Sequence, residues 1–149
     1  MIMCLTAANR LRFLNVLFVL LLVVSCTAKV DEGSTAGEYY DKAYQFIDGG
    51  YVKEAKDLLD LAIKKNPSFL EAYYNRGVVL YFLKEYEEAI KDFNRVIEMD
   101  SRNAMAYASR GSVYEKTNYP DLALRDFRTA ARLGDKDSQA YLKSRSIDW

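Results

Sequence analysis

The feature that most limits how this chain can fold is an internal repeat of 34 residues. Asn-Arg-Gly at 75–77 recurs as Ser-Arg-Gly at 109–111, and Lys-Asp-Phe at 91–93 recurs as Arg-Asp-Phe at 125–127. Extended in both directions, this shift divides most of the chain into three units without insertions: 36–69, 70–103 and 104–137. A unit of this size cannot bury its apolar face alone, so the units are expected to stack on one another.

Each unit is predicted to form two helices. In the second unit, two stretches place apolar or small residues at positions i, i+4 and i+7, which is the spacing of a helix with one apolar face. These residues are Tyr73, Gly77 and Leu80, followed by Ala89, Phe93 and Val96. Thr35 and Ser68, each with a glutamate three residues later, have the spacing of capping boxes. Asn103 is a candidate cap for the third unit, and Gly49-Gly50 separates the helices of the first. We therefore predict an all-α fold.

The unit resembles the tetratricopeptide repeat, and the resemblance rests on residues that recur in all three units. The family's aromatic residue at unit position 4, small residue at 8 and alanine at 20 are matched by Tyr39, Tyr73 and Tyr107, by Ala43, Gly77 and Gly111, and by Ala55, Ala89 and Ala123. One departure is Lys84, where the family usually has a turn glycine. The resemblance implies a right-handed superhelix of three antiparallel helix pairs with a C-terminal capping helix.

Residues 138–144 are predicted to form the capping helix, because a repeat stack needs a cover for its last apolar face. Ala140 and Tyr141 are expected to cover the last repeat. The residues expected to face water are Gln139, Lys143 and Arg145. Trp149 either packs on this helix or is exposed.

Two pairs of opposite charges recur at one spacing within their units. They are Arg76 with Asp92 and Arg110 with Asp126. We predict that each pair joins the two helices of its unit. As surface ion pairs, they are expected to contribute little to stability.

In the tetratricopeptide repeat family, the first helix of each unit lines the concave surface of the superhelix. The resemblance places nine residues in a partner-binding groove: Tyr40, Tyr44, Tyr74, Asn75, Val78, Tyr81, Phe82, Met105 and Ser109. Tyrosine suits docking because it combines a large apolar body with a polar tip. Two alternatives remain open. Either the curvature of the stack buries these rings within it, or a second copy covers them in a homodimer.

One subclass of the family binds acidic C-terminal tails of chaperones through a clamp of lysine, arginine and asparagine. Only Asn75 matches that clamp, whose basic positions hold Tyr40, Met105 and Ser109 in this chain. The residues present therefore do not support binding of such tails.

The N-terminus has the organisation of a bacterial lipoprotein signal. Arg10 and Arg12 precede an almost wholly apolar run of 12 residues, 13–24, whereas a membrane-spanning helix needs about 20. The run leads into Val-Val-Ser-Cys ending at Cys26, which resembles a lipobox and implies cleavage before Cys26 and lipidation of its sulfur. The alternative is an ordinary cleaved signal. We expect anchoring in the bacterial cell envelope. Thr27 stands where aspartate would retain the protein at the inner membrane, which favours the outer membrane.

Composition argues against several classes of function. The chain has 21 basic and 21 acidic residues, so it lacks the basic balance typical of nucleic-acid binders. It contains no histidine, the commonest general base and metal ligand, and its two cysteines are Cys4 and Cys26. Glycine-rich phosphate-binding loops are absent from the sequence. We therefore expect no enzymatic activity, no cofactor and no metal site. A hydrolase with two carboxylates is a remote alternative.

The predicted organisation follows from these features. Its parts are a signal peptide at 1–25, a lipidated cysteine and tether at 26–35, three repeat units at 36–69, 70–103 and 104–137, and a capping helix with tail at 138–149. We expect an adaptor, anchored to the membrane by its lipid, that binds another protein or an extended peptide. The alternative is a self-associating scaffold subunit.

Overall fold

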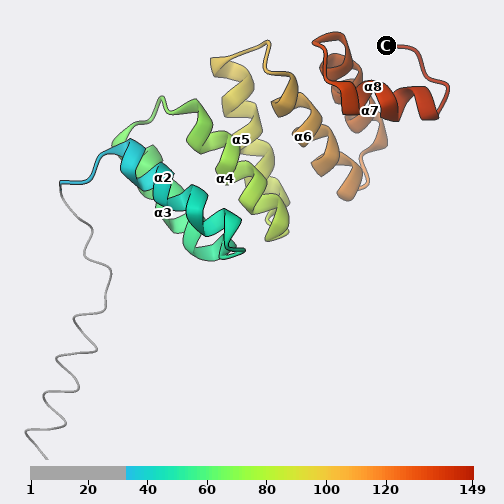
Figure 1. Cartoon of the computed structure of the whole chain (residues 1–149). Coiled ribbons are helices and arrows are strands. Elements are labelled where there is room, and N and C mark those ends of the chain that lie inside the picture. The colour runs from blue at the N-terminus through green and yellow to red at the C-terminus, as the bar shows by residue number, and fades with distance from the viewer. Residues whose placement is uncertain (1–32) are drawn as a thin grey trace, which may run out of the picture. The chain divides into compact units, whose positions relative to one another are not determined.

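The computed structural model describes residues 33–149, and this part of the chain is entirely helical, with seven helices and no strand (Figure 1). The helices are α2 (Ala36–Asp48), α3 (Val52–Lys65), α4 (Leu70–Phe82), α5 (Tyr86–Met99), α6 (Ala104–Lys116), α7 (Pro120–Arg132) and α8 (Lys136–Ser144). The predicted all-α class is confirmed. The predicted signal segment 1–25 and Cys26 lie outside the described residues.

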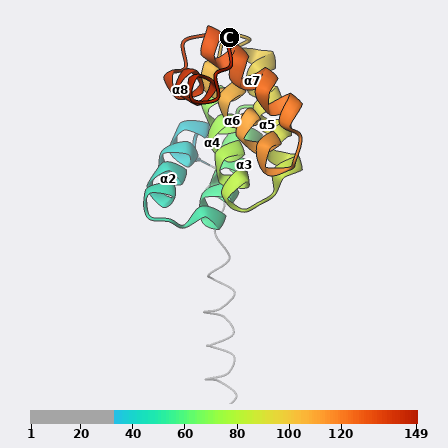
Figure 2. The ribbon, with the colours of Figure 1, turned by 90° about the vertical axis from the view of Figure 1, so that its right-hand side faces the viewer.

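Residues 34–149 form one compact unit in which every helix packs against the next one along the chain. The first helices of the three pairs, α2, α4 and α6, begin at residues 36, 70 and 104, which are 34 residues apart. The order along the stack follows the order in the chain, from α2 at one end to α7 and α8 at the other (Figure 1). Figure 2 views the stack from the α7–α8 end.

The helix starts show where local sequence signals act. Thr35 caps α2 in a complete capping box with Glu38, and the Asn103 side chain accepts a hydrogen bond of 3.0 Å from the amide of Ala106 in α6. The predicted box at Ser68 is wrong. The backbone amide and hydroxyl of Ser68 both donate to Oδ1 of Asn66, at 3.1 and 2.8 Å, so this serine belongs to a turn before α4.

Small residues let the two helices of a pair approach closely. A Cβ atom on Gly77 in α4 would lie 2.8 Å from Cε1 of Phe93 in α5, and one on Gly111 would lie 3.0 Å from the same atom of Phe127. Phe93 is almost completely buried. Each glycine therefore leaves room for the large ring of the partner helix, which fills the space between the helices.

The capping helix covers the last pair, but with a different face from the one predicted. Leu142 and Ser138 are buried, whereas Ala140 is exposed. The Tyr141 ring packs on Phe127 with 4.5 Å between ring centroids, as expected of a covering residue. Ser138, Tyr141 and Leu142 have the i, i+3, i+4 spacing of one helix face, and Ala140 lies on another face.

Two further expectations about the C-terminal residues have different outcomes. Gln139 does not simply face water, because its amide donates a 2.8 Å hydrogen bond to the carbonyl of Ala131 in α7. Lys143 and Arg145 are exposed as expected. Trp149 is exposed, with 42% of its surface accessible.

Both predicted ion pairs are present, but they are not surface pairs. The guanidinium of Arg76 binds both carboxylate oxygens of Asp92 at 2.7 and 2.8 Å. Arg110 binds Asp126 in the same two-pronged manner at 2.7 and 2.9 Å. The Asp92 and Asp126 side chains are only 6% and 2% exposed. Removing an arginine would therefore leave a buried charge without its partner, which is much costlier than losing a surface pair.

None of the helices in residues 33–149 has the length and apolar character that crossing a membrane requires.

Candidate functional site

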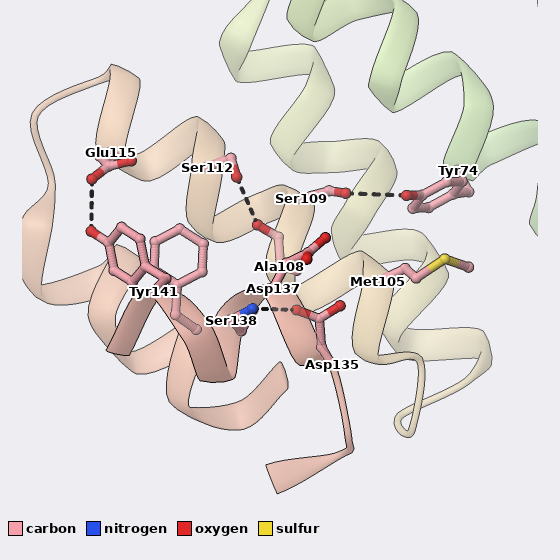
Figure 3. A pocket seen from close by; sticks show the side chains of 11 residues that line it. Tyr74, Met105, Ala108, Ser109, Ser112, Glu115, Asp135, Asp137, Ser138 and Tyr141 are labelled. Atoms are coloured by element: carbon pink, nitrogen blue, oxygen red, sulfur yellow. Dashed lines mark hydrogen bonds between the residues drawn. The ribbon is translucent and has the colours of Figure 1, made fainter. Parts of the chain in front are cut away.

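The first helices of the three pairs are joined by hydrogen bonds between side chains of the predicted groove. Nδ2 of Asn75 in α4 donates to the Tyr40 hydroxyl in α2 at 2.9 Å. The Tyr74 hydroxyl and the Ser109 hydroxyl, on α4 and α6, lie 3.3 Å apart (Figure 3). Each bond links residues 35 positions apart in the sequence. These four predicted residues therefore hold neighbouring repeats in register.

The predicted tyrosines also pack against the rest of the stack. The Tyr40 ring lies 5.0 Å from that of Phe69, and the Tyr74 ring lies 5.9 Å from that of Phe93. Tyr81 contacts two further aromatic rings that follow it in the sequence. All three tyrosines are partly buried. These three rings are therefore partly covered within the stack, as one of the two alternatives expected.

Three predicted residues are more than half exposed. Phe82, Met105 and Tyr44 have 66%, 56% and 53% of their surface accessible. Phe82 and Met105 line clefts, which are described next. Tyr44 lies on α2, outside both of these clefts.

A cleft of about 450 Å³ opens between α6 and α8 (Figure 3). The predicted residues Tyr74, Met105 and Ser109 line it on one side. The other lining residues are Ala108, Ser112, Glu115, Phe127, Asp135, Asp137, Ser138 and Tyr141. Sequence reasoning did not include the α8 residues in the site. The sequence feature that could have pointed to these residues is Asp135, which caps the start of α8. Its side chain accepts a hydrogen bond from the Ser138 amide at 2.7 Å.

A second, smaller cleft of about 190 Å³ continues along the groove. It is lined by Val78, Tyr81, Phe82, Phe93, Ser109 and Ser112. Ser109 and Ser112 line both clefts, and their short side chains leave the groove open between them. The structure therefore brings together six of the nine predicted groove residues around these clefts, while Tyr40, Asn75 and Tyr44 lie beyond them.

Acidic groups dominate the charge of the larger cleft. Glu115, Asp135 and Asp137 line it, and none of its lining residues is basic. The Tyr141 hydroxyl donates to Oε1 of Glu115 at 2.7 Å. Burial raises the pKa of Tyr141, and the hydrogen bond to the Glu115 carboxylate raises it further. The nearby guanidinium of Arg145 acts in the opposite direction.

The electrostatic environment is also negative around Tyr40, at the α2 end of the groove. Burial raises the pKa of Tyr40, and the charges of Glu71 and Asp41 add to this shift. The hydrogen bond from Asn75 lowers it. Two acidic side chains, Glu71 and Asp41, therefore lie near Tyr40, and three line the cleft at the opposite end of the groove.

Aromatic surface, hydroxyl groups and carboxylates are suited to recognising a ligand by packing and hydrogen bonding. Within residues 33–149, histidine, cysteine, aspartate and glutamate form no group of three or more that could hold a metal ion.

The family model of the tetratricopeptide repeat matches residues 70–103, which contain α4 and α5. Among curated relatives, human neutrophil cytosol factor 2 is 35% identical over 78 residues. That match covers 52% of this chain and 15% of the human protein. The first curated relatives are all much longer, since this chain spans between 5% and 32% of their lengths.

Solved structures show the same arrangement of helices. The crystal structure of MamA has a TM-score of 0.65 and 28% identity, and the match covers 70% of this chain and 61% of MamA. The second tetratricopeptide domain of Spaghetti (RPAP3), bound to the HSP90 peptide SRMEEVD, has a TM-score of 0.65 and 25% identity. Here the match covers 67% of this chain and 93% of that domain.

Proposed function

We propose that this chain, in which residues 70–103 match the tetratricopeptide repeat model and whose fold is similar to that of MamA, is a non-catalytic adaptor that binds a partner protein or extended peptide in its concave groove. The observation that carries this proposal is the pair of adjoining clefts of about 450 and 190 Å³ that share Ser109 and Ser112. A groove with aromatic walls and a few polar groups can accept a chain segment, because packing supplies affinity and hydrogen bonds supply orientation.

Two observations support a peptide rather than a small metabolite as the ligand. The clefts adjoin along the first helices of successive repeats, so together they form an elongated open site. The related Spaghetti domain, of similar fold, is bound to a peptide. The exposed side chains of Phe82 and Met105 offer apolar surface on which a peptide side chain can pack.

Photocrosslinking at defined positions tests this function. A photoreactive amino acid is placed at Met105 or Phe82, and in a control chain at Glu98, which is exposed on α5 and lies outside both clefts. In cells, partner adducts are expected from the two groove positions and not from the control. Adding Ser109→Arg, which fills the region shared by the clefts, should remove them. Adducts of equal yield at all three positions would show that the groove is not the docking site.

We further propose that the adaptor is tethered to a bacterial envelope membrane, the outer one where two are present. This rests on the Val-Val-Ser-Cys sequence ending at Cys26 and on the short polar stretch that follows. The eight residues 27–34 reach roughly 28 Å when fully extended, at about 3.5 Å per residue. The groove would therefore act on partners close to the membrane surface.

The two cysteines provide a matched pair of variants for this anchor. Cys26→Ser should move the protein from the membrane fraction to the soluble fraction and abolish incorporation of a labelled fatty acid. Cys4→Ser lies in the segment predicted to be removed, so both measurements should stay as in the wild type. A Cys26→Ser protein that still incorporates fatty acid would contradict the lipoprotein assignment.

The second candidate function is a self-associating scaffold, which the exposed Phe82 and Met105 favour. Its test is the mass of the chain in solution by light scattering, with Phe82→Ser as the variant. Tyr74 is a poorer choice, because its ring packs on Phe93 and its hydroxyl meets Ser109 within the stack. A dimer that Phe82→Ser converts to a monomer supports the scaffold, whereas a wild-type monomer rules it out.

A further inference from the structure

We propose that the groove recognises a basic segment, an extended peptide whose lysine or arginine side chains enter the α6–α8 cleft. This inference rests on the proposed docking function and adds the chemistry of the partner. It is carried by the distribution of charge over the concave face, by the aromatic walls of the cleft, and by the contrast with acidic-peptide recognition in a related domain.

Charge is unevenly distributed in this domain. Residues 34–149 contain 18 basic and 19 acidic side chains, which is almost a balance. On the first helices, however, the positions that line the concave side in this family carry four carboxylates and one ammonium group. They are Asp41, Asp48, Glu71, Glu115 and Lys116. The cations of the domain are therefore concentrated elsewhere, and the concave face is negative.

The capping helix strengthens this bias. Asp135 and Asp137, at the N-terminal end of α8, line the cleft together with Glu115 of α6 (Figure 3). Arg145 is a cation at the rim, where its guanidinium lies 3.8 Å from Glu115. The same guanidinium lies over the Tyr141 ring, 4.0 Å from the centroid, so this cation is already engaged within the chain.

The walls of the cleft suit cationic side chains as well. The rings of Tyr74, Phe127 and Tyr141 line it, and the face of an aromatic ring attracts a guanidinium or ammonium group. The chain shows this interaction internally, where Arg110 lies 5.5 Å from the Tyr107 ring centroid. Because Arg145 already lies over the Tyr141 ring, a lysine or arginine of the partner would meet the remaining aromatic surface and the carboxylates of this cleft.

The related Spaghetti domain provides the contrast, because its bound peptide SRMEEVD contains three carboxylate side chains and one arginine. In this chain, Tyr40, Met105 and Ser109 stand at the positions where an acid-binding clamp would require basic residues. An acidic peptide would meet the carboxylates of the concave face without compensating cations. Like charges brought together in this way reduce affinity for the wrong partner.

Two fluorescent heptapeptides of opposite charge test the inference. SRMEEVD is compared with SRMKKVK, in which every acidic residue is replaced by lysine, using fluorescence anisotropy and the full chain purified in detergent. SRMKKVK is expected to bind at least roughly tenfold more tightly at low ionic strength. The difference should shrink at about 0.5 M salt, because salt screens exposed charges. Equal affinities, a preference for SRMEEVD, or no binding of either peptide would overturn the inference.

A double variant locates the charge effect in the cleft. Glu115→Gln with Asp137→Asn keeps the shape of both side chains, and the new amide oxygen at position 115 can still accept the hydrogen bond from the Tyr141 hydroxyl. Asp135 is left in place because it caps α8. The matched control, Asp57→Asn with Glu87→Gln, removes two exposed carboxylates outside both clefts. Affinity for SRMKKVK should fall about fivefold to tenfold in the cleft variant and by less than about twofold in the control.

The outcomes separate this inference from the docking function. If partner crosslinks form at Met105 while the peptides show no preference for positive charge, docking in the groove stands and the basic partner is wrong. If both double variants weaken SRMKKVK equally, the peptide responds to net charge and the cleft has no special role. If crosslinks at Met105 are absent, the docking function itself fails.

Discussion

Arg76 and Arg110 each connect helices of two neighbouring units. The guanidinium of Arg76 in α4 binds Asp92 in α5 and also Asp60 in α3, and Arg110 in α6 adds a hydrogen bond to Asn94 in α5. In both cases the partners lie 16 residues before and 16 residues after the arginine. Each arginine therefore joins the two helices of its own unit and also links that unit to the preceding one. The sequence spacing predicted only the first half of this arrangement.

Replacing Arg76 by methionine should destabilise the fold strongly. Arg76→Met leaves the buried Asp92 carboxylate without its cation, so the free energy of unfolding is expected to fall by about 3–5 kcal/mol. Urea denaturation followed by circular dichroism measures the change. The double variant Arg76→Met/Asp92→Leu should recover much of the loss, because it removes the unpaired charge as well.

The control is Arg95→Met, which removes an exposed pair with Glu98 on α5. Surface pairs of this kind contribute below about 0.5 kcal/mol. If Arg76→Met lowered the free energy of unfolding as little as Arg95→Met does, the burial of Asp92 would have no energetic role.

Gly77→Ala should destabilise the protein although alanine favours helices. The added methyl would lie 2.8 Å from Phe93. Overpacking of this kind costs about 1–3 kcal/mol, against a gain in helix propensity of about 1 kcal/mol. The expected result is a net loss of up to about 2 kcal/mol in urea denaturation. Gly37→Ala, whose methyl would meet only Thr35 at 3.9 Å, should be neutral or stabilising. A stabilised Gly77→Ala protein would contradict close packing at this position.

The sequence could predict which residues the groove contains better than how exposed they are. Tyr74 and Asn75 were expected on the concave face because of their unit positions. Their bonds to Ser109 and Tyr40 depend on the distance between neighbouring repeats, which the sequence does not state. Asp135 and Asp137 were missed for a different reason: the groove was predicted only from the first helix of each unit, whereas these residues lie at the start of α8, at the end of the third unit.

The turns between paired helices share a backbone conformation that the sequence only partly reveals. Gly50, Lys84 and Asn118 stand 34 residues apart and have φ angles of 79°, 64° and 63°. Glycine adopts this left-handed conformation readily, asparagine less so, and lysine only at a cost. Lys84, which stands where the family usually has glycine, therefore adopts the same left-handed turn conformation as Gly50 and Asn118. Its backbone does so at an energetic cost.

Lys84→Gly should stabilise the α4–α5 turn. Removing the side chain relieves a left-handed penalty of about 1–2 kcal/mol, part of which is lost to the greater flexibility of glycine in the unfolded chain. Thermal denaturation is expected to show a gain of about 0.5–1 kcal/mol. Lys84→Ala keeps the penalty while deleting the lysine charge, so it separates the two effects. A gain in the alanine variant equal to that in the glycine variant would assign the effect to the charge.

Boundaries were predictable where one local signal acts alone. Thr35 forms the expected capping box with Glu38. Ser68 has the same spacing to a glutamate but donates hydrogen bonds to Asn66 instead. The capping helix shows the same limit. Ser138 and Leu142, four residues apart, form the inward face of α8, and Ala140 is exposed to solvent. Helical spacing fixes which residues share a side, but in a helix of nine residues it did not decide which side packs on α7.

The stack is linear, and this governs how its stability is distributed. Each helix packs mainly on its neighbours in sequence, from α2 through to α8. In such arrays, stability is approximately a sum of repeat and interface contributions. The pair α4–α5 has a neighbouring pair on both sides, while α2 and α8 each lie at an end (Figure 1). The 34-residue period was sufficient to predict this order, but the cleft between α6 and α8 was not predicted.

Hydrogen exchange should therefore show a gradient of protection along the stack. Amides of α4 and α5 are expected to exchange most slowly, and those of α2 and α8 to open with free energies about 1–3 kcal/mol lower. Leu142→Ala, which removes a fully buried contact of the cap, should lower protection in α7 and α8 and leave α2 and α3 unchanged. Exchange measured by mass spectrometry resolves the helices individually. Equal protection in all the described helices, falling together in Leu142→Ala, would show that the three repeats unfold as one cooperative unit instead.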